Sequence, residues 1–493
     1  MFLLITRLLH IEKNRAWLVI RLALPIMGSM LVQTFINLFD TAIIGLLPKE
    51  YSISGQAALG YSVILHWLLG GFASCISVGT QAMTARRFGE GNKEAAGKVL
   101  FNALCLALVI GTLFSLVGVL SAKRLFRLVS SNEHVLEQGV PYVTARLAGI
   151  LAMVGTLVTK AFFDGLGKTH YHLFVAIVMN VLNAILAILL VFGFLGFPRM
   201  YVLGAGIAAL LASYFGLFLI LGITLTRRYR NEFKVFRLKN FDLGLQGSIL
   251  RLSLPSGVAT VVVMTGFLLF FKWVGMIDQK VSGEGLTSFV PYMHGLLPFA
   301  VSQEAFHNFL ATRQPIFEAA TKVIIDLLSI SFMPCIGLGV ATATLVSQSL
   351  GAKQPKEAER FGWTAVRLAV IFTAILAFFK LLLPDVAMRI FTHDPEVIDC
   401  GRAPLRLIAS GEWLMAFALV FAQALFGAGA TRYVMKVELV MHTLCLVPLS
   451  YVLGLVLDLK LLGIWASALI YLLGLAIAMT AKFAGGDWKK IVI

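Results

Sequence analysis

Charged residues are scarce in this chain. Of 493 residues, only 13% are Asp, Glu, Lys or Arg and 59% are hydrophobic, whereas about a quarter of an average soluble protein is charged. The mean hydropathy is +0.88. These values exclude an ordinary soluble fold, and the long apolar runs provide for about twelve membrane spans of ~20 residues each.

Motifs for catalysis, metal binding and disulfide formation are also lacking. The five cysteines are scattered and include no C-x-x-C pair, so neither a zinc site nor a disulfide framework is indicated. The nine histidines show no H-E-x-x-H spacing, and no G-x-x-x-x-G-K-[ST] phosphate loop is present. ATP-driven pumping and metal-dependent hydrolysis are therefore disfavoured, and we expect neither an enzyme nor a cofactor.

The apolar runs predict twelve transmembrane helices. They lie at approximately 17–45, 57–84, 98–120, 139–163, 170–195, 201–226, 251–277, 317–348, 361–384, 403–427, 432–457 and 461–484. Each run exceeds the ~10 residues of a barrel strand and does not alternate between polar and apolar positions. Because lipid leaves no partner for free backbone groups, helices are the remaining choice. The fold class is an all-α polytopic membrane protein.

Basic residues are distributed unevenly between the connections. When the connections are numbered alternately, one side receives most of the 41 Lys and Arg, including the cluster at 227–239. Cytoplasmic loops carry such an excess, so we expect both termini on the cytoplasmic side of an inner cell membrane. We attribute the net charge of +16 to this orientation, because nucleic-acid binders concentrate their basic residues on a soluble face.

A motif near the start of the chain recurs in its second half. RLALP at Arg21–Pro25 returns as RLSLP at Arg251–Pro255, an offset of 230 residues, and the glycine turn at 165–167 returns at 427–429, an offset of 262. With six helices in each half, the halves share one topology and are related by an axis along the membrane normal, as in parallel-repeat transporters. Their interface is the expected place for a substrate.

The repeat also predicts how the chain is divided. Residues 1–226 form an N-terminal six-helix lobe, 227–250 a basic cytoplasmic linker, and 251–493 a C-terminal six-helix lobe, with a central cavity between the lobes. The change of offset from 230 to 262 places 32 extra residues at about 279–314. We predict an extracytoplasmic loop with an interfacial helix there, covering the outer mouth. A disordered insertion without function is the alternative.

Several motifs together carry a family resemblance. They are LPIMGSMLVQTFINLFDTAIIG in the first helix, VGTQAMTARRFGEGNKEAA after the second, FMPCIGLGVATATLVSQSLGAKQPKEAE after the eighth, and the glycine turns DGLGKTH and FGAGATR. The chain resembles, over nearly its whole length, the MATE multidrug and toxin extrusion transporters. The resemblance implies two lobes that face a central cavity, and export of organic cations or other amphiphiles coupled to inward flow of Na⁺ or H⁺.

A polar stripe runs along the first predicted helix. Four of its members are spaced four, four and three residues apart, which puts them on one face of a helix, and the fifth directly follows the last of them. They are Ser29, Gln33, Asn37, Asp40 and Thr41. Unpaired polar groups that face lipid cost several kcal/mol each, so this stripe must turn toward protein or water. Asp40 is its carboxylate. The alternative for Asp40 is a solvated helix end, because it lies near the end of the helix.

The resemblance assigns roles on this helix. Asp40 matches the first-helix aspartate that the family uses for cation coupling, and Pro25 matches the family's helix-bending proline. Pro255 is the counterpart of Pro25 in the second repeat and is the second expected hinge. Proline cannot donate to the helix ladder, which permits a bend at these positions.

The fifth helix departs from the family pattern. Asn180 and Asn183 match the family's N-x-x-N, but the acidic residue expected four positions later is Ala187. A hard cation prefers several oxygen ligands, and one aspartate with neutral amides supplies few of them. We therefore expect a cation-coupling site of Asp40, Asn37, Asn180 and Asn183 that carries H⁺ rather than Na⁺.

The second half offers two further carboxylates, Asp326 and Glu412. Intramembrane charges are functional candidates by default, although the family's second-lobe acidic positions do not fall cleanly on these residues. We expect Asp326, one turn after Lys322, to be structural rather than functional. Asp326 and Glu412 remain cavity candidates together with Gln33 and Thr41.

These observations predict a secondary active exporter. Two lobes would alternate access and exchange H⁺ or Na⁺ for a small amphiphilic or cationic substrate, in a monomer surrounded by lipid that binds no nucleic acid. One alternative is a lipid-linked saccharide flippase of the same wider superfamily; flippases usually have more helices and a more basic cavity, and few basic residues lie inside these spans. Another is a membrane scaffold or enzyme, which the missing catalytic constellation disfavours.

Overall fold

The computed structural model describes residues 12–129, 133–294 and 316–493. Throughout these ranges the regular structure is helical, with short 3-10 and π segments and no strand. The predicted all-α fold is thereby confirmed. Nine described helices are long and apolar enough to cross a membrane, and eleven segments are when each bent helix pair counts as one.

The first half of the chain forms the N-terminal lobe. Its helices are α2 (Lys13–Gly45), α3 (Lys49–His66), α4 (Ile76–Gly89), α5 (Lys93–Val129), α6 (Glu133–Ala148), α7 (Ile150–Gly165), α8 (His170–Phe192) and α9 (Tyr201–Leu225). Two predicted spans are broken: α3 and α4 meet at 45°, and α6 and α7 at 41°. A π segment, η1 (Trp67–Gly71), follows α3, and Gly149 separates α6 from α7.

The second half forms the C-terminal lobe. Its α-helices are α11 (Leu243–His294), α13 (Ile316–Gly351), α14 (Pro355–Leu382), α15 (Pro384–Arg389), α16 (Pro395–Ser410), α17 (Phe421–Ala428), α18 (Thr431–Val440), α19 (Val447–Tyr451) and α20 (Lys460–Gly485). Three π segments interrupt the tenth and eleventh predicted spans. η4 (Ala416–Val420) precedes α17 in the tenth, and η5 (Met441–Leu446) and η6 (Val452–Val456) flank α19 in the eleventh. Each of the twelve predicted helices corresponds to one of these continuous or broken helices.

The segment with the extra residues begins differently from the prediction. We expected a loop from about residue 279, but α11 continues without a break to His294. A helical glycine costs only about 1 kcal/mol relative to alanine, so Gly283 and Gly285 are tolerated within a helix of this length. Residues 295–315, which include the rest of the predicted loop, lie outside the described residues.

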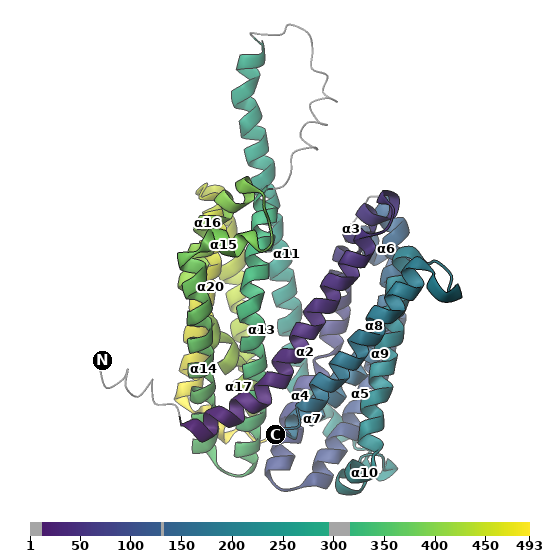
Figure 1. Ribbon diagram of the computed structural model, residues 1–493. Coiled ribbons are helices and arrows are strands. Elements are labelled where there is room, and N and C mark those ends of the chain that lie inside the picture. Colours follow the sequence, from purple (N-terminus) through teal and green to yellow (C-terminus); the bar gives the residue numbers. More distant parts are fainter. Residues whose placement is uncertain (1–11, 130–132, 295–315) are drawn as a thin grey trace.

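The first helix of each half packs against both lobes. In α2, Val19 and Ile26 belong to the apolar core of the C-terminal lobe, whereas Ile44 packs with α8 and α9 in the N-terminal lobe. In α11 the arrangement is reversed, because Ile249 lies in the N-terminal core and Phe270 in the C-terminal core. Figure 1 shows α2 crossing obliquely from one lobe to the other. The two lobes are therefore interlocked by their leading helices.

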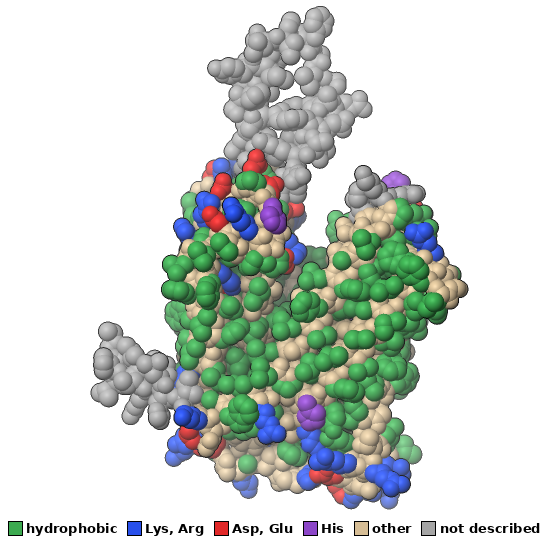
Figure 2. Space-filling model, in the orientation of Figure 1, with side chains coloured by type: hydrophobic (Ala, Val, Ile, Leu, Met, Phe, Trp, Pro, Cys, Tyr) green, Lys and Arg blue, Asp and Glu red, His purple; other side chains and the backbone are tan. Residues whose placement is uncertain are grey.

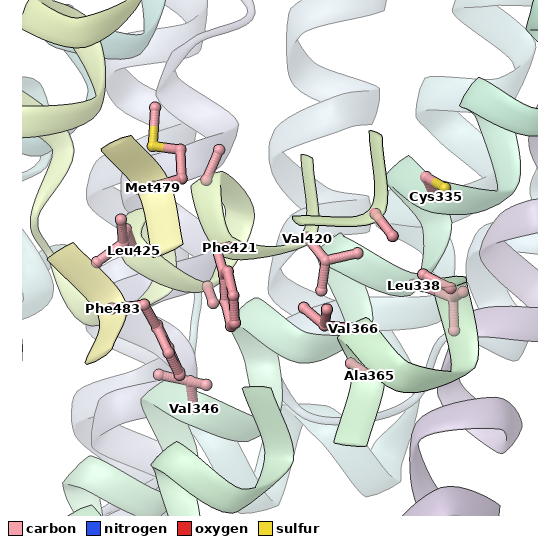
Figure 3. Close-up of a cluster of buried hydrophobic side chains, with 14 of the residues drawn as sticks. Cys335, Leu338, Val346, Ala365, Val366, Val420, Phe421, Leu425, Met479 and Phe483 are labelled. Atoms are coloured by element: carbon pink, nitrogen blue, oxygen red, sulfur yellow. The ribbon is translucent and has the colours of Figure 1, made fainter. Parts of the chain in front are cut away.

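The C-terminal core is built from α13, α14, α17 and α20. Leu338 and Val346 of α13 belong to one cluster with Val366 of α14, and Phe421 stacks on Phe483 with ring centroids 4.4 Å apart (Figure 3). These side chains are buried almost completely. Burying a side chain of this size contributes about 1.5–3 kcal/mol, so this cluster holds the second lobe together.

The basic linker is docked onto the N-terminal lobe. It contains α10 (Arg227–Phe233), and the rings of Tyr229 and Phe233 are buried in the N-terminal core. Asn102 of α5 donates from Nδ2 to the carbonyl of Asn240 at 2.7 Å, and its Oδ1 accepts from the backbone N–H of Asp242 at 2.9 Å. The linker is therefore a fixed part of this lobe. Figure 2 shows Lys and Arg clustered near α10, below a largely hydrophobic belt.

The two lobes touch closely at the end that carries α10. A Cβ on Gly89 would lie 2.1 Å from the carbonyl oxygen of Gln348, and a Cβ on Gly351 would lie 2.2 Å from that of Arg86. Gly89 and Gly351 are related by the repeat offset, so the approach is reciprocal.

Side-chain hydrogen bonds complete this contact. Gln81 donates to Thr344 Oγ1 at 2.9 Å, and Ser347 donates to the carbonyl of Ala82 at 2.7 Å. At the opposite end the lobes part and leave a notch (Figure 2).

Candidate functional site

A cavity of about 300 Å³ lies inside the N-terminal lobe, between α2, α3, α6, α7, α8 and α9. This volume is at the lower end of the range for small-molecule sites. Its apolar wall includes Met30, Trp67, Met153, Leu157 and Met179. The polar side chains that line it are Ser29, Gln33, Asn37, Asp40, His66, Arg146, Thr156, Lys160, His172, Asn180, Asn183 and Ser213.

Asp40 is buried in this cavity. It is 5% exposed, and Asn183 donates from Nδ2 to its Oδ1 at 3.3 Å. Asn180 lies one turn before Asn183 on α8, and its buried Nδ2 has no partner within the described residues. On α2, Gln33 donates to Asn37 Oδ1 at 3.5 Å. The fold brings Asp40 together with the amides that the sequence selected, and their role in coupling stays a prediction.

Two cationic side chains also enter the cavity, and the sequence prediction missed both in this role. Arg146 comes from the end of α6, just before the break at Gly149, and Lys160 comes from α7. Lys160 stands near the end of the helix predicted at 139–163, and it is 6% exposed inside the lobe. The helices that carry Arg146 and Lys160, α6 and α7, meet at a bend of 41° beside the cavity. A hydropathy profile does not reveal such a bend.

Neither cation makes a direct ion pair in the described residues, although Lys160 lies near Asp164, one turn later on α7. Within the described residues, Arg146 and Lys160 make no hydrogen bond and no ion pair through their side chains. Arg146 lies near Asp40, which lines the same cavity. The lining thus has two cationic groups and one carboxylate, and the expectation of few basic residues inside the spans is wrong for this cavity.

His172 lies beside a second buried carboxylate. Its Nδ1 is 2.9 Å from Asp164 Oδ2, and Asp164 Oδ1 is buried without a partner in the described part of the chain. The carbonyl of Asp164 accepts from Thr344 Oγ1 of the other lobe at 3.0 Å. This group therefore joins the cavity wall to the contact between the lobes.

Three of the predicted candidates do not line this cavity. Thr41 donates back to the carbonyl of Asn37 at 3.0 Å. Asp326 pairs with Lys322 at 2.6 Å on a partly exposed helix face, and its structural role stays a prediction. The carboxylate of Glu412 is fully buried in the C-terminal lobe.

Glu412 has a partner that the sequence did not reveal. Lys380 Nζ of α14 lies 2.5 Å from Glu412 Oε1 and donates to Ser331 Oγ at 3.0 Å. Both charged side chains are at most 5% exposed. The other carboxylate oxygen, Glu412 Oε2, has no partner among the described residues. Lys380 and Glu412 form a closed pair with no connection to the first-lobe cavity.

The predicted hinges lie inside the two crossing helices. Pro25 falls within α2 and Pro255 within α11, the two helices that pack against both lobes. Neither proline can donate the backbone hydrogen bond that a helix needs at its position. No group of three or more His, Cys, Asp or Glu side chains in the described ranges is arranged to hold a metal ion.

Comparison with known proteins identifies the family. The family model MatE matches residues 25–189 and 289–452, which is most of the chain. The chain belongs to the MatE family. This confirms the resemblance found in the sequence, and it makes the chain a multi-pass membrane transporter and not an enzyme.

Relatives of this MatE chain extend over nearly its full length. A probable multidrug resistance protein NorM of Thermotoga maritima is 25% identical over 483 residues, which cover 96% of this chain and 92% of the relative. Another, from Oceanobacillus iheyensis, is 23% identical and covers 95% and 96%. A solved outward-facing multidrug resistance MATE transporter of the MOP superfamily has a TM-score of 0.80 at 20% identity, covering 96% and 97%. That structure supports the fold alone.

Proposed function

We propose that the protein is a secondary active exporter that exchanges H⁺ for a small amphiphilic substrate. The observation that carries the proposal is Asp40, a buried carboxylate that faces a cavity and is held by an amide of the neighbouring helix. A charged carboxylate inside a membrane protein is costly, so it is typically kept where it is repeatedly neutralised. The names of the NorM relatives support multidrug export.

The coupling step follows from the position of Asp40 on α2. Protonation removes the negative charge that accepts the hydrogen bond from Asn183, which weakens the contact between α2 and α8. Because Pro25 leaves a gap in the backbone hydrogen bonds of α2, the helix can bend there. A bend at Pro25 reshapes the cavity wall and expels the substrate. H⁺ is favoured over Na⁺ because Ala187 removes a second carboxylate from this lobe.

The charge distribution supports an orientation. The clusters of Lys and Arg near α10 place that end in the cytoplasm of an inner cell membrane, together with both termini. The close contact of Gly89 and Gly351 is then on the cytoplasmic side, and the notch opens outward. The protein acts as a monomer in lipid, without a cofactor. Residues 1–226 and 251–493 are its two functional halves.

Gradient-driven export from vesicles tests the proposal. Wild-type protein, Asp40→Asn and the control Asp326→Asn are reconstituted at matched amounts, and export of fluorescent amphiphiles of positive, zwitterionic and negative charge is followed under separate H⁺ and Na⁺ gradients. We expect an H⁺ gradient to drive export by the wild type and the control, but not by Asp40→Asn. Normal export by Asp40→Asn contradicts the mechanism, and export driven by Na⁺ alone contradicts the choice of ion.

One observation favours a second candidate function. Arg146 and Lys160 make the cavity more basic than the sequence indicated, as expected for a flippase of lipid-linked saccharides. A flippase would move a fluorescent lipid-linked saccharide between leaflets in the same vesicles and would export none of the water-soluble dyes. That result would replace the exporter by the flippase.

A further inference from the structure

The first-lobe cavity contains cationic groups that the proposed coupling step does not use. Lys160 is 6% exposed and lines the cavity, and Arg146 reaches the same cavity from α6. Neither side chain makes a hydrogen bond or an ion pair within the described part of the chain, and Asp164, the carboxylate near Lys160, is already in contact with His172. Burial of an unpaired charge is expensive, so such groups normally have a partner.

A second buried lysine in the same chain shows what a structural lysine looks like. Lys380 is 4% exposed, lies 2.5 Å from Glu412 and donates to Ser331. Lys160 has the same degree of burial but lacks any such contact in the described residues. The difference is that Lys160 faces a cavity and Lys380 does not. A ligand in that cavity is in a position to supply the missing partner.

The uncharged polar groups of the cavity also include free donors. Asn180 Nδ2 and Thr156 Oγ1 are buried and have no partner among the described residues. Amide N–H and hydroxyl groups donate to oxyanions, as ammonium and guanidinium groups do. The carboxylate of Asp40 is the one anionic side chain in the lining, and it already accepts from Asn183.

We propose that Arg146 and Lys160 form an anion subsite in this cavity, and that the transported amphiphile carries a carboxylate, sulfonate or phosphate group beside its apolar body. The inference rests on the proposed export function and specifies its substrate class. Charge-assisted hydrogen bonds hold the anionic group, and Met30, Trp67 and Met153 contact the apolar part. This assignment differs from the organic cations that the family resemblance suggested.

Direct binding tests the subsite without any ion gradient. The probe is naphthalene-2-sulfonate, titrated calorimetrically into purified protein in a neutral detergent, with 2-naphthol as the uncharged analogue. We expect the sulfonate to bind more tightly than 2-naphthol. Arg146→Gln and Lys160→Gln should each weaken sulfonate binding by about tenfold or more, because each removes a charged hydrogen-bond donor. Binding of 2-naphthol should change little.

Control variants separate this effect from misfolding. Lys272→Gln removes the same charge from an exposed position on α11 that is not part of the cavity lining, and it should bind as the wild type does. Arg146→Lys and Lys160→Arg keep the charge and should retain most of the affinity. Equal affinity for sulfonate and 2-naphthol, or full sulfonate binding by both Gln variants, overturns the subsite.

The same titration distinguishes a free anion from a lipid headgroup. Short-chain phosphatidic acid and phosphatidylcholine are each added as competitors. Displacement of the sulfonate by phosphatidic acid alone assigns a lipid headgroup to the subsite, and displacement by neither assigns a water-soluble anion. Displacement by both to the same extent shows apolar competition and counts against the anion subsite. Because no gradient is used, a failure of Asp40-dependent coupling leaves this result unaffected.

Discussion

The buried pair in the C-terminal lobe allows a quantitative prediction. Lys380 and Glu412 are at most 5% exposed and 2.5 Å apart. Removing one partner of a buried ion pair costs about 3–5 kcal/mol, because the other charge is left uncompensated. In Lys380→Met, Glu412 loses its only partner among the described residues. In Glu412→Met, Lys380 keeps only the hydroxyl of Ser331. Each single variant should lose about 3–5 kcal/mol of unfolding free energy.

The double variant is expected to recover most of this loss. Met is similar in volume to both side chains, and replacing a buried pair by apolar residues is often neutral or stabilising. Unfolding free energies of the wild type, both single variants and the double variant can be measured by denaturant titration in mixed micelles. The control pair is Lys322→Met and Asp326→Met on a partly exposed face, where an exposed ion pair contributes about 0–1 kcal/mol. A double variant whose loss equals the sum of the two single losses would refute the assignment of a closed, structural pair.

Further predictions concern the contact between the lobes near α10, the orientation and the Asp40 site. Gly89→Val places a side chain 2.1 Å from the Gln348 carbonyl oxygen, so it should force the lobes apart and speed the labelling of Thr344→Cys from the α10 side. The control Gly60→Val, at a position where a Cβ meets nothing within 4 Å, should leave the labelling rate unchanged. Equal labelling rates for the two variants contradict a tight contact. Arg230→Cys in a cysteine-free background should resist membrane-impermeant reagents in whole cells and react in inverted vesicles, and ready labelling from outside would reverse the orientation. Asn183→Ala removes the hydrogen bond to Asp40, which contributes about 0.5–1.5 kcal/mol. The variant should shift the pH dependence of export and leave expression unchanged. An unaltered pH profile would show that this bond plays no part in coupling.

The sequence predicted the helices well because membrane insertion depends on local composition. A run of about twenty apolar residues is sufficient to define a span, and the spacing of Asn37 and Asp40 along α2 fixes their common face whatever surrounds them. Asp40, Asn180 and Asn183 therefore met around one cavity, as expected. The end of α11 was not predicted, because the prolines, glycines and mixed charge of residues 279–314 indicated a loop, whereas the helix continues to His294.

The cations and their partners could not be predicted because they depend on contacts between distant segments. Lys380 and Glu412 lie on different helices, and no local pattern connects them. Lys160 stands near the end of an apolar run, where a lysine is usually solvated. Its burial in the cavity depends on how α7 packs against α2 and α8. The signal available in the sequence was Arg146, a charged residue well inside a predicted span.

The interlocking of α2 and α11 has a consequence for how the chain is assembled during synthesis. When the first six membrane segments have left the ribosome, the N-terminal core still lacks Ile249 and Leu252, which α11 supplies. The leading half of α2, with Val19 and Ile26, has no core to join until α13 has been made. Neither half can complete its packing alone. The helices are therefore inserted into the membrane first, and both apolar cores are completed together once the second half has been made.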